Sequence, residues 1–108
     1  MKEIKAYIKA NKQDEVTRAL HQIDGLSGAS FSEVLGFGSS KAASHGYNPN
    51  RDPSGYVRHV KVEVVCEDTL VDEVVRTLHR AAHTGLCGDG RIYVSGVDRE
   101  IRIQEAPR

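Results

Sequence analysis

The stretch that decides the fold is VRHVKVEVVCEDTLVDEVVRTLHRAA, residues 57–82. In its first part, apolar side chains occupy every second position from Val60 to Val64, between charged or polar neighbours. This period of two is typical of a strand with one buried face. From Val71 to Ala82 the apolar residues recur at helical spacing instead, so that they form one stripe. The stretch therefore predicts a strand followed directly by an amphipathic helix.

The rest of the chain repeats these two patterns. EIKAYIK, residues 3–9, alternates like a half-buried strand, and residues from Val16 to Ile23 carry a second helical stripe. SFSEVL, residues 30–35, predicts another strand, and RIYVSGV, residues 91–97, predicts one more. EIRIQ, residues 100–104, is either a short fifth strand or an extended tail.

The predicted order is strand, helix, strand, a long loop, and then strand, helix, strand. Two such units in a small domain predict an α+β ferredoxin-like fold, in which two helices cover one face of an antiparallel sheet of four main strands. The other face of the sheet is left open, and its residues are of mixed polarity. A partner that covers this face is the natural expectation, and self-association would supply one.

The ends of the helices carry their own signals. We expect Asn11 to cap the first helix, and Thr69 with Asp72 to form a capping box at the second. Gly25 and Gly85 are placed to end the two helices, because glycine adopts the left-handed conformation without a side-chain penalty.

Length and charge exclude several classes of protein. The 108 residues suit one domain with a single modest core. The 15 basic and 15 acidic side chains balance, whereas a protein that binds nucleic acid or anionic membranes needs a basic surface. No apolar run is long enough to span a membrane, and the first residues lack the apolar segment of a secretion signal. We therefore expect a cytoplasmic protein with no nucleic-acid partner and no direct membrane insertion.

The residues give little support to metal chemistry or catalysis. Cys66 and Cys87 form no C-x-x-C pair, and Cys66 is expected in the core. His79 and His83 lie four apart on one helix face, a spacing that zinc sites use, but a solvated helix surface is the favoured reading. No arrangement of nucleophile and base stands out. The sequence predicts neither a metal site nor an enzyme.

Three segments are candidates for ligand binding. Ser39 to Gly55 is polar and aperiodic, and loops of this length are usually functional or disordered. GFG, residues 36–38, allows a sharp turn and a close approach to a ligand. GDGR, residues 88–91, fits a hairpin turn, but it also fits a nest of backbone N–H groups that binds an anion beside Arg91. From these residues alone, both interpretations of GDGR stay open.

In order and separation, five segments resemble the PII signal-transduction family, in a divergent PII-like form. They are MKEIKAYIKANKQDEVTRAL, SEVLGFG, VKVEVV, TGLCGDGRIYV and REIRI. The resemblance spans essentially the whole chain and implies a single PII-like domain, residues 1–108, that assembles as a ferredoxin-like homotrimer. It implies that adenine nucleotides bind in the clefts between subunits. It also implies that a long flexible loop, residues 39–58, signals to a protein target such as a transporter or an enzyme.

The same resemblance implies which residues bind the nucleotide. The phosphates would be held by Gly88, Asp89, Gly90 and Arg91, where Arg91 replaces a usual lysine. Arg102 matches a phosphate-binding arginine. The positions that line the cleft or surround the adenine and ribose are Ser30, Gly36, Phe37, Gly38, Glu63, Val65 and Thr84.

Five positions depart from the family pattern. The glutamine that ligates magnesium and 2-oxoglutarate falls on Ser40, and the lysine that pairs with the 2-oxoglutarate carboxylate falls on His59. A basic residue near the triphosphate falls on Ser39, and a second terminal arginine falls on Gln104. The loop tyrosine that is modified in enteric members falls on Asp52, which excludes uridylylation at that position.

The departures at Ser39, Ser40 and Gln104 remove two cations and a metal ligand from around the γ-phosphate. A charge-assisted hydrogen bond to phosphate contributes about 1.5–3 kcal/mol, so we expect ADP and AMP to bind at least as well as ATP. We also expect little response to 2-oxoglutarate, and a role for Mg²⁺ stays open. A bicarbonate-sized anion could occupy the vacated space. The candidate effector- or anion-binding residues are Ser39, Ser40, Lys41 and His59.

The sequence thus predicts a PII-like regulatory protein that senses ADP, AMP or ATP, with bicarbonate as co-effector in inorganic-carbon regulation (carboxysome or bicarbonate transport). One alternative is a nitrogen-regulatory PII protein that responds to ATP and 2-oxoglutarate. Another is a metal-responsive PII-like module associated with metal efflux.

Overall fold

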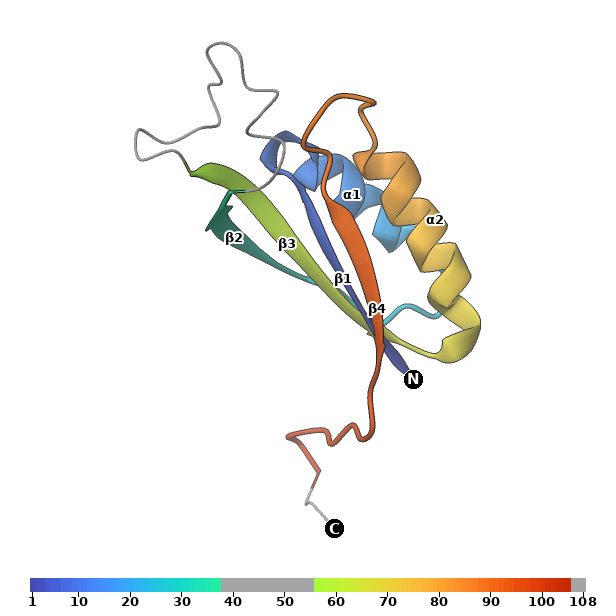
Figure 1. The fold of residues 1–108 in the computed structure, drawn as a ribbon. Coiled ribbons are helices and arrows are strands. Elements are labelled where there is room, and N and C mark those ends of the chain that lie inside the picture. Colours follow the sequence, from blue (N-terminus) through green and yellow to red (C-terminus); the bar gives the residue numbers. More distant parts are fainter. Residues whose placement is uncertain (38–55, 106–108) are drawn as a thin grey trace.

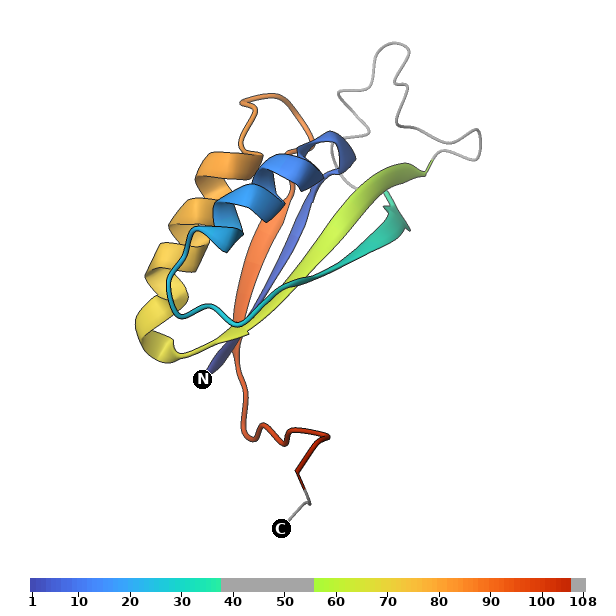
Figure 2. The same ribbon diagram turned by 180° about the vertical axis from the view of Figure 1, so that it is seen from behind.

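The computed structural model describes residues 1–37 and 56–105, and in this part of the chain four strands form one antiparallel sheet (Figure 1). The strands are β1 (Lys2–Lys9), β2 (Ser30–Gly36), β3 (Val57–Cys66) and β4 (Arg91–Gly96), in the order β2-β3-β1-β4. The helices are α1 (Gln13–His21) and α2 (Val71–Ala82). Both lie on the same face of the sheet (Figure 2). This is the α+β ferredoxin-like arrangement that the sequence predicted.

The core lies between the sheet and the two helices. The alternation in β1 turns Ile4, Ala6 and Ile8 toward the helices, and each of them is almost fully buried. Ile4 lies opposite Val64 of β3, so the buried faces of neighbouring strands are in register. The helical stripes fill the space above them. The remaining buried residues of the core are Val16, Leu20, Ile23, Val60, Val62, Cys66, Val74, Leu78 and Ala82.

The opposite face of the sheet carries polar and apolar residues together and is not covered by either helix. Lys5 lies opposite Glu63, and an ion pair of 3.4 Å joins Lys61 Nζ to Glu63 Oε1. Tyr7 and Tyr93 pack edge to face on this surface, with ring centroids 6.2 Å apart. We call this surface the open face.

Both helices begin differently from the prediction. Asn11 lies inside the 3-10 turn η1 (Ala10–Lys12), and Thr69 lies inside the 3-10 turn η3 (Asp68–Leu70). The predicted side-chain caps were wrong, because no side-chain cap bond is found at either helix start. The 3-10 turns explain this result. The N–H of Gln13 donates to the carbonyl of Ala10, and the N–H of Val71 donates to that of Asp68, so backbone acceptors do the capping.

The segments that follow the helices and β4 agree better with the sequence. Gly25 and Gly85, just beyond the helices, have φ angles of +85° and +80°. Residues 100–104 form no strand, which leaves the extended-tail alternative, and Ile101 and Ile103 in this tail are exposed. The tail leaves the sheet at the end opposite to the loop that joins α2 to β4 (Figures 1 and 2). No helix among the described residues is both long and apolar enough to cross a membrane.

Candidate functional site

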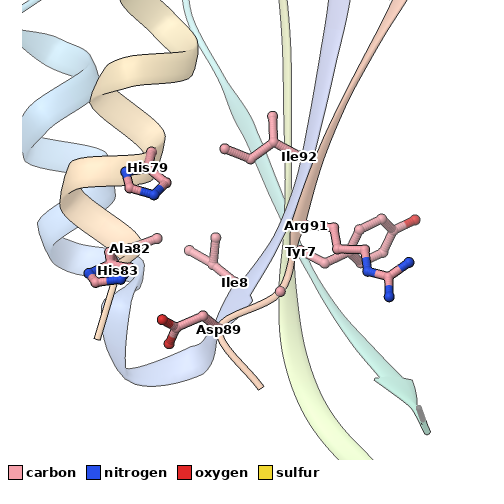
Figure 3. A pocket seen from close by; sticks show the side chains of 9 residues that line it. Tyr7, Ile8, His79, Ala82, His83, Asp89, Arg91 and Ile92 are labelled. Atoms are coloured by element: carbon pink, nitrogen blue, oxygen red, sulfur yellow. The ribbon is translucent and has the colours of Figure 1, made fainter. Parts of the chain in front are cut away.

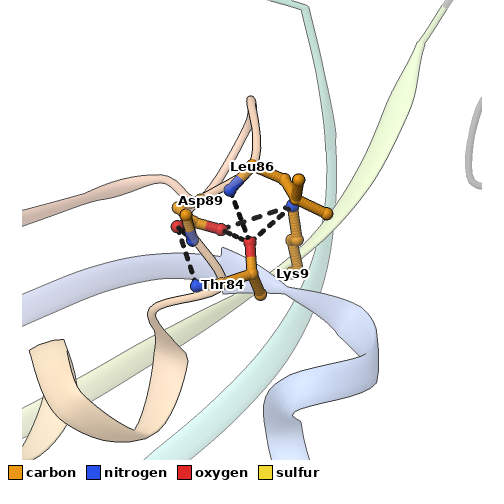
Figure 4. Close-up of polar contacts among 5 residues, drawn as sticks. Lys9, Thr84, Leu86 and Asp89 are labelled. Carbon is orange, nitrogen blue, oxygen red and sulfur yellow. Dashed lines mark hydrogen bonds and ion pairs between the residues drawn. The ribbon is translucent and has the colours of Figure 1, made fainter.

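The loop between α2 and β4 is closed by the carboxylate of Asp89. Its Oδ2 accepts hydrogen bonds from the backbone N–H groups of Thr84, at 2.9 Å, and Gly85, at 3.0 Å. Its Oδ1 accepts a hydrogen bond from the Thr84 hydroxyl (Figure 4). Asp89 therefore ties the end of the loop to its beginning. The loop joins a helix to a strand, so the hairpin-turn interpretation of GDGR does not apply.

Lys9, the last residue of β1, anchors this loop to the sheet. Its ammonium group donates to Thr84 Oγ1 at 3.1 Å and lies 3.3 Å from Asp89 Oδ1 (Figure 4). The N–H of Leu86 also donates to Thr84 Oγ1, at 3.1 Å. The side chains of Lys9 and Asp89 are only 18% and 24% exposed. Sequence reasoning missed Lys9, because the only local signal is a charged residue at the end of a strand.

The same contacts fix the charge of Asp89. Burial acts to raise the pKa of the Asp89 carboxyl, but hydrogen bonds from the Thr84 hydroxyl, the backbone N–H groups of Thr84 and Gly85, and Lys9 oppose it. Together these bonds outweigh burial and hold the pKa well below its usual range. The carboxylate is therefore ionised at neutral pH and keeps its role as the acceptor that closes the loop.

Glycines let the loop backbone pass close to β1. Gly88 and Gly90 have φ angles of +84° and +100°, which residues with a side chain rarely adopt. A Cβ atom built on Gly90 would lie 1.6 Å from the carbonyl oxygen of Tyr7. Glycine is therefore required at position 90 by both space and conformation.

A groove of about 790 Å³ lies beside this loop and is lined by residues of all four strands, β1, β2, β3 and β4. It contains one group of the residues that the sequence marked as functional. That group is Gly36, Phe37, His59, Gly88, Asp89, Gly90 and Arg91. Tyr7 and Tyr93 also line the groove, and no sequence motif marked either of them as functional.

A second group of predicted residues lies in another place. Ser30, Glu63 and Val65 line a separate cavity of about 480 Å³, together with Glu3 and Glu100. Ser30 and Gly36 are the two ends of β2, about 20 Å apart along the strand, and each lines only one of these two cavities. Within one chain, the predicted nucleotide residues are therefore split into two half-sites.

The remaining predicted residues lie elsewhere. Thr84 belongs to the network of Lys9 and Asp89, and Arg102 is exposed in the tail. The tail and the α2–β4 loop lie at opposite ends of the sheet, so one chain does not bring Arg102 to Arg91 (Figure 1). Four predicted site residues fall outside the described part of the chain: Gly38, Ser39, Ser40 and Lys41. Asp52, at the position of the modified tyrosine, also lies outside it. Of the predicted loop 39–58, Val57 and Arg58 belong to β3.

A third cavity, of about 290 Å³, lies on the helix side of β1 and β4. His79 and His83 border it with stacked rings, whose centroids are 5.2 Å apart. Figure 3 shows Arg91 and Tyr7 on the other side of the strands from these histidines. Both histidines are exposed on the helix surface. Among the described residues, no cluster of three or more His, Cys, Asp or Glu side chains could hold a metal ion.

Comparison with known proteins gives a consistent result over the whole chain. The family model described as nitrogen regulatory protein P-II matches residues 1–106. A nitrogen regulatory protein P-II of Rhodospirillum rubrum is 41% identical over 108 residues, which cover 100% of this chain and 96% of that protein. Proteins of that name from Azospirillum brasilense, and P-II 1 from Escherichia coli, are each 41% identical over 104 residues. Those 104 residues are 96% of this chain and 92% of either relative.

Proposed function

Because this chain belongs to the nitrogen regulatory protein P-II family, we propose that it is a regulatory protein, not an enzyme, that binds adenine nucleotides beside the α2–β4 loop. The observation that carries the proposal is the groove of about 790 Å³, whose wall is the glycine loop closed by Asp89. We propose that it acts in the cytoplasm, with a protein as its target.

The loop has the features of a phosphate site. The N–H groups of Thr84, Gly85 and Leu86 already have acceptors within the loop. A phosphate is therefore bound by the later segment, Gly88–Arg91, where glycines give close access to the backbone. Arg91 lines the same groove and supplies a cation that binds phosphate through charge-assisted hydrogen bonds.

The split half-sites support a homotrimer. Gly88–Arg91 line one cavity of the chain, whereas Ser30, Glu63 and Val65 line another. We infer that a nucleotide contacts these two groups on neighbouring subunits. In a cyclic assembly, the first half-site of one subunit faces the second half-site of its neighbour. The same contact brings the neighbour's exposed tail, with Arg102, toward the phosphates and covers Ile101 and Ile103.

The regulatory context follows from the relatives. Their names, nitrogen regulatory protein P-II, favour a nitrogen-regulatory protein that responds to ATP and 2-oxoglutarate over an inorganic-carbon regulator. We therefore place nitrogen regulation first.

One observation favours bicarbonate as a second candidate effector. His59 lines the groove at the position where the resemblance implies a lysine that pairs with 2-oxoglutarate. An imidazole is a weaker cation than a lysine at neutral pH, which suits a small monoanion better than a dicarboxylate. This candidate places the protein in inorganic-carbon regulation.

Calorimetry tests both the site and the context. ATP, ADP and AMP are titrated alone, with 2-oxoglutarate and with bicarbonate. We expect ADP and AMP to bind at least as tightly as ATP; no binding of any of the three below about 1 mM would refute the proposed function. Tighter ATP binding in 2-oxoglutarate supports nitrogen regulation, whereas tighter binding in bicarbonate supports the second candidate. Arg91→Ala should weaken binding, and Arg99→Ala, at an exposed arginine beyond β4, is the control.

The metal-efflux alternative has a separate test. Zinc is titrated into the wild type and a His79→Ala/His83→Ala double variant. An unchanged stoichiometry removes this alternative, and loss of one metal per chain supports it.

A further inference from the structure

The loop that is proposed to bind phosphate contains a carboxylate. Asp89 lines the groove beside Gly88, Gly90 and Arg91. A fixed negative charge in this place repels a phosphate, and the repulsion increases with each phosphate that the ligand carries. The loop nevertheless needs Asp89, because this side chain accepts the hydrogen bonds that close it. The site therefore requires a positive charge that neutralises Asp89 and leaves its carboxylate in place as the acceptor.

The ammonium group of Lys9 is placed to supply this positive charge. Its Nζ lies 3.3 Å from Asp89 Oδ1, and both side chains are more than three-quarters buried. Such a pair interacts more strongly than an exposed one, because less water screens it. With Lys9 present, the two charges cancel, and Arg91 is left as the cation of the loop. Without Lys9, the charge of Asp89 would offset that of Arg91.

Lys9 acts through Asp89 rather than on the ligand. Its ammonium group is engaged by Thr84 Oγ1 and Asp89 Oδ1, and the groove is lined by Asp89 and not by Lys9. Lys9 is thus a positioning residue. Lys9 belongs to the sheet, where it lies opposite His59 in the register of β1 and β3. Its side chain therefore reaches the loop from β1.

We propose that Lys9 neutralises Asp89 within the α2–β4 loop, and that this neutralisation determines how the affinity of the site changes with the number of phosphates on the ligand. The inference rests on the proposed function, because it assumes that adenine nucleotides bind in the groove. A residue that only stabilises the loop would affect AMP, ADP and ATP alike, since all three use the same backbone. A residue that sets the charge of the loop affects them in order of their charge.

The test is a comparison of the three affinities at pH 8 without divalent metal, where the phosphates are fully ionised. In Lys9→Met, the loss of affinity should increase from AMP to ADP to ATP, with ATP losing about tenfold more than AMP. Lys9→Arg keeps the charge and should keep the ATP-to-AMP affinity ratio. The double variant Lys9→Met/Asp89→Asn has no net charge at the pair, and its ratio should return toward the wild-type value.

The control is Lys12→Met. Lys12 is also ion-paired, but its partner, at 3.3 Å, is Glu15 in α1, and both residues lie outside the α2–β4 loop. This variant should leave the ratio unchanged.

Each failure has a distinct meaning. An equal loss for all three nucleotides in Lys9→Met, or a double variant whose ratio stays as low as that of Lys9→Met, overturns the inference while the proposed function stands. No binding of any nucleotide to the wild type overturns the proposed function itself. If Lys9→Met does not fold, as judged by circular dichroism, Lys9→Gln and Lys9→Arg are compared, and equal ratios in the two refute the inference.

Discussion

The backbone of Gly90 passes directly over Tyr7, so that a Cβ atom at position 90 would lie only 1.6 Å from the Tyr7 carbonyl oxygen. Tyr7 is in the central strand β1, and Gly90 immediately precedes the edge strand β4. This crossing point sets the path by which the loop enters the sheet. It also sets where the loop closed by Asp89 lies relative to the groove.

We expect Gly90→Ala to lower the free energy of unfolding by about 3 kcal/mol or more, because the loop must both move away from Tyr7 and leave a φ of +100°. Gly88→Ala is the matched control. Gly88 has a similar φ of +84°, but the nearest atom to its Cβ would be Lys9 Cε at 3.9 Å. Gly88→Ala should then lower the free energy of unfolding only by the cost of a side chain at positive φ, about 1–2 kcal/mol. Urea unfolding measures both, and equal effects would contradict the role of the crossing.

The pKa of Asp89 makes a prediction about acid stability. This pKa is lower in the folded chain than in the unfolded chain, where an Asp carboxyl titrates at about 3.9. The stability that Asp89 contributes is therefore fully present above about pH 5 and is lost as the pH falls through the folded pKa. We expect Asp89→Asn to remove this part of the acid dependence and to lower stability at pH 7 by about 1–3 kcal/mol.

Urea unfolding at pH 7, 5, 4 and 3 measures this dependence. Asp72→Asn, at an exposed carboxyl of α2, is the control and should keep the wild-type slope. An Asp89→Asn variant that loses as much stability between pH 5 and pH 3 as the wild type would show that Asp89 is not responsible.

The split site predicts complementation between subunits. Arg91→Ala damages the half-site at the loop, and Val65→Glu places a negative charge in the other half-site. Each variant alone should bind nucleotide more weakly than the wild type. When the two are mixed, unfolded and refolded together, about one quarter of the clefts should receive two intact halves and bind with wild-type affinity. Calorimetric stoichiometry measures this fraction, and a mixture that stays inactive would argue that each site belongs to one chain.

The groove also predicts how specificity for 2-oxoglutarate can be changed. His59→Lys puts a full positive charge into the groove, so we expect 2-oxoglutarate to bind about tenfold more tightly in the presence of ATP. Ser32→Lys adds the same charge to β2 outside the groove and is the control. Calorimetry decides between them. If both variants gain equally, the gain is a general charge effect and His59 has no special position.

Much of the fold followed from local patterns, whereas the helix starts did not. The alternation from Val60 to Val64 and the stripe from Val71 to Ala82 predicted the correct elements, since burial of one face imposes these periods on any sequence. The caps were wrong, because a 3-10 turn and an α-helix begin with the same residue types. The backbone geometry that separates them is not encoded in a short pattern.

The candidate site also has features that local sequence patterns indicated and features that only the structure revealed. The residue types in the glycine loop left a turn and a phosphate site open, and the family membership that five segments together suggested was confirmed. The partnership of Lys9 with Thr84 joins residues 75 positions apart, so no local pattern could show it.

By itself, the sequence determined the order of the elements, the two-layer architecture and the position of the glycine loop, because each of these depends on periodicity or on residue types within a short segment. Only the tertiary structure decided that Lys9 and Asp89 form a pair, and that the predicted nucleotide residues fall into two half-sites at opposite ends of the open face. The physical reason is that β1 and β4 are neighbours in the sheet although distant in sequence. Their register brings Tyr7 beside Arg91 and the end of β1 beneath the loop.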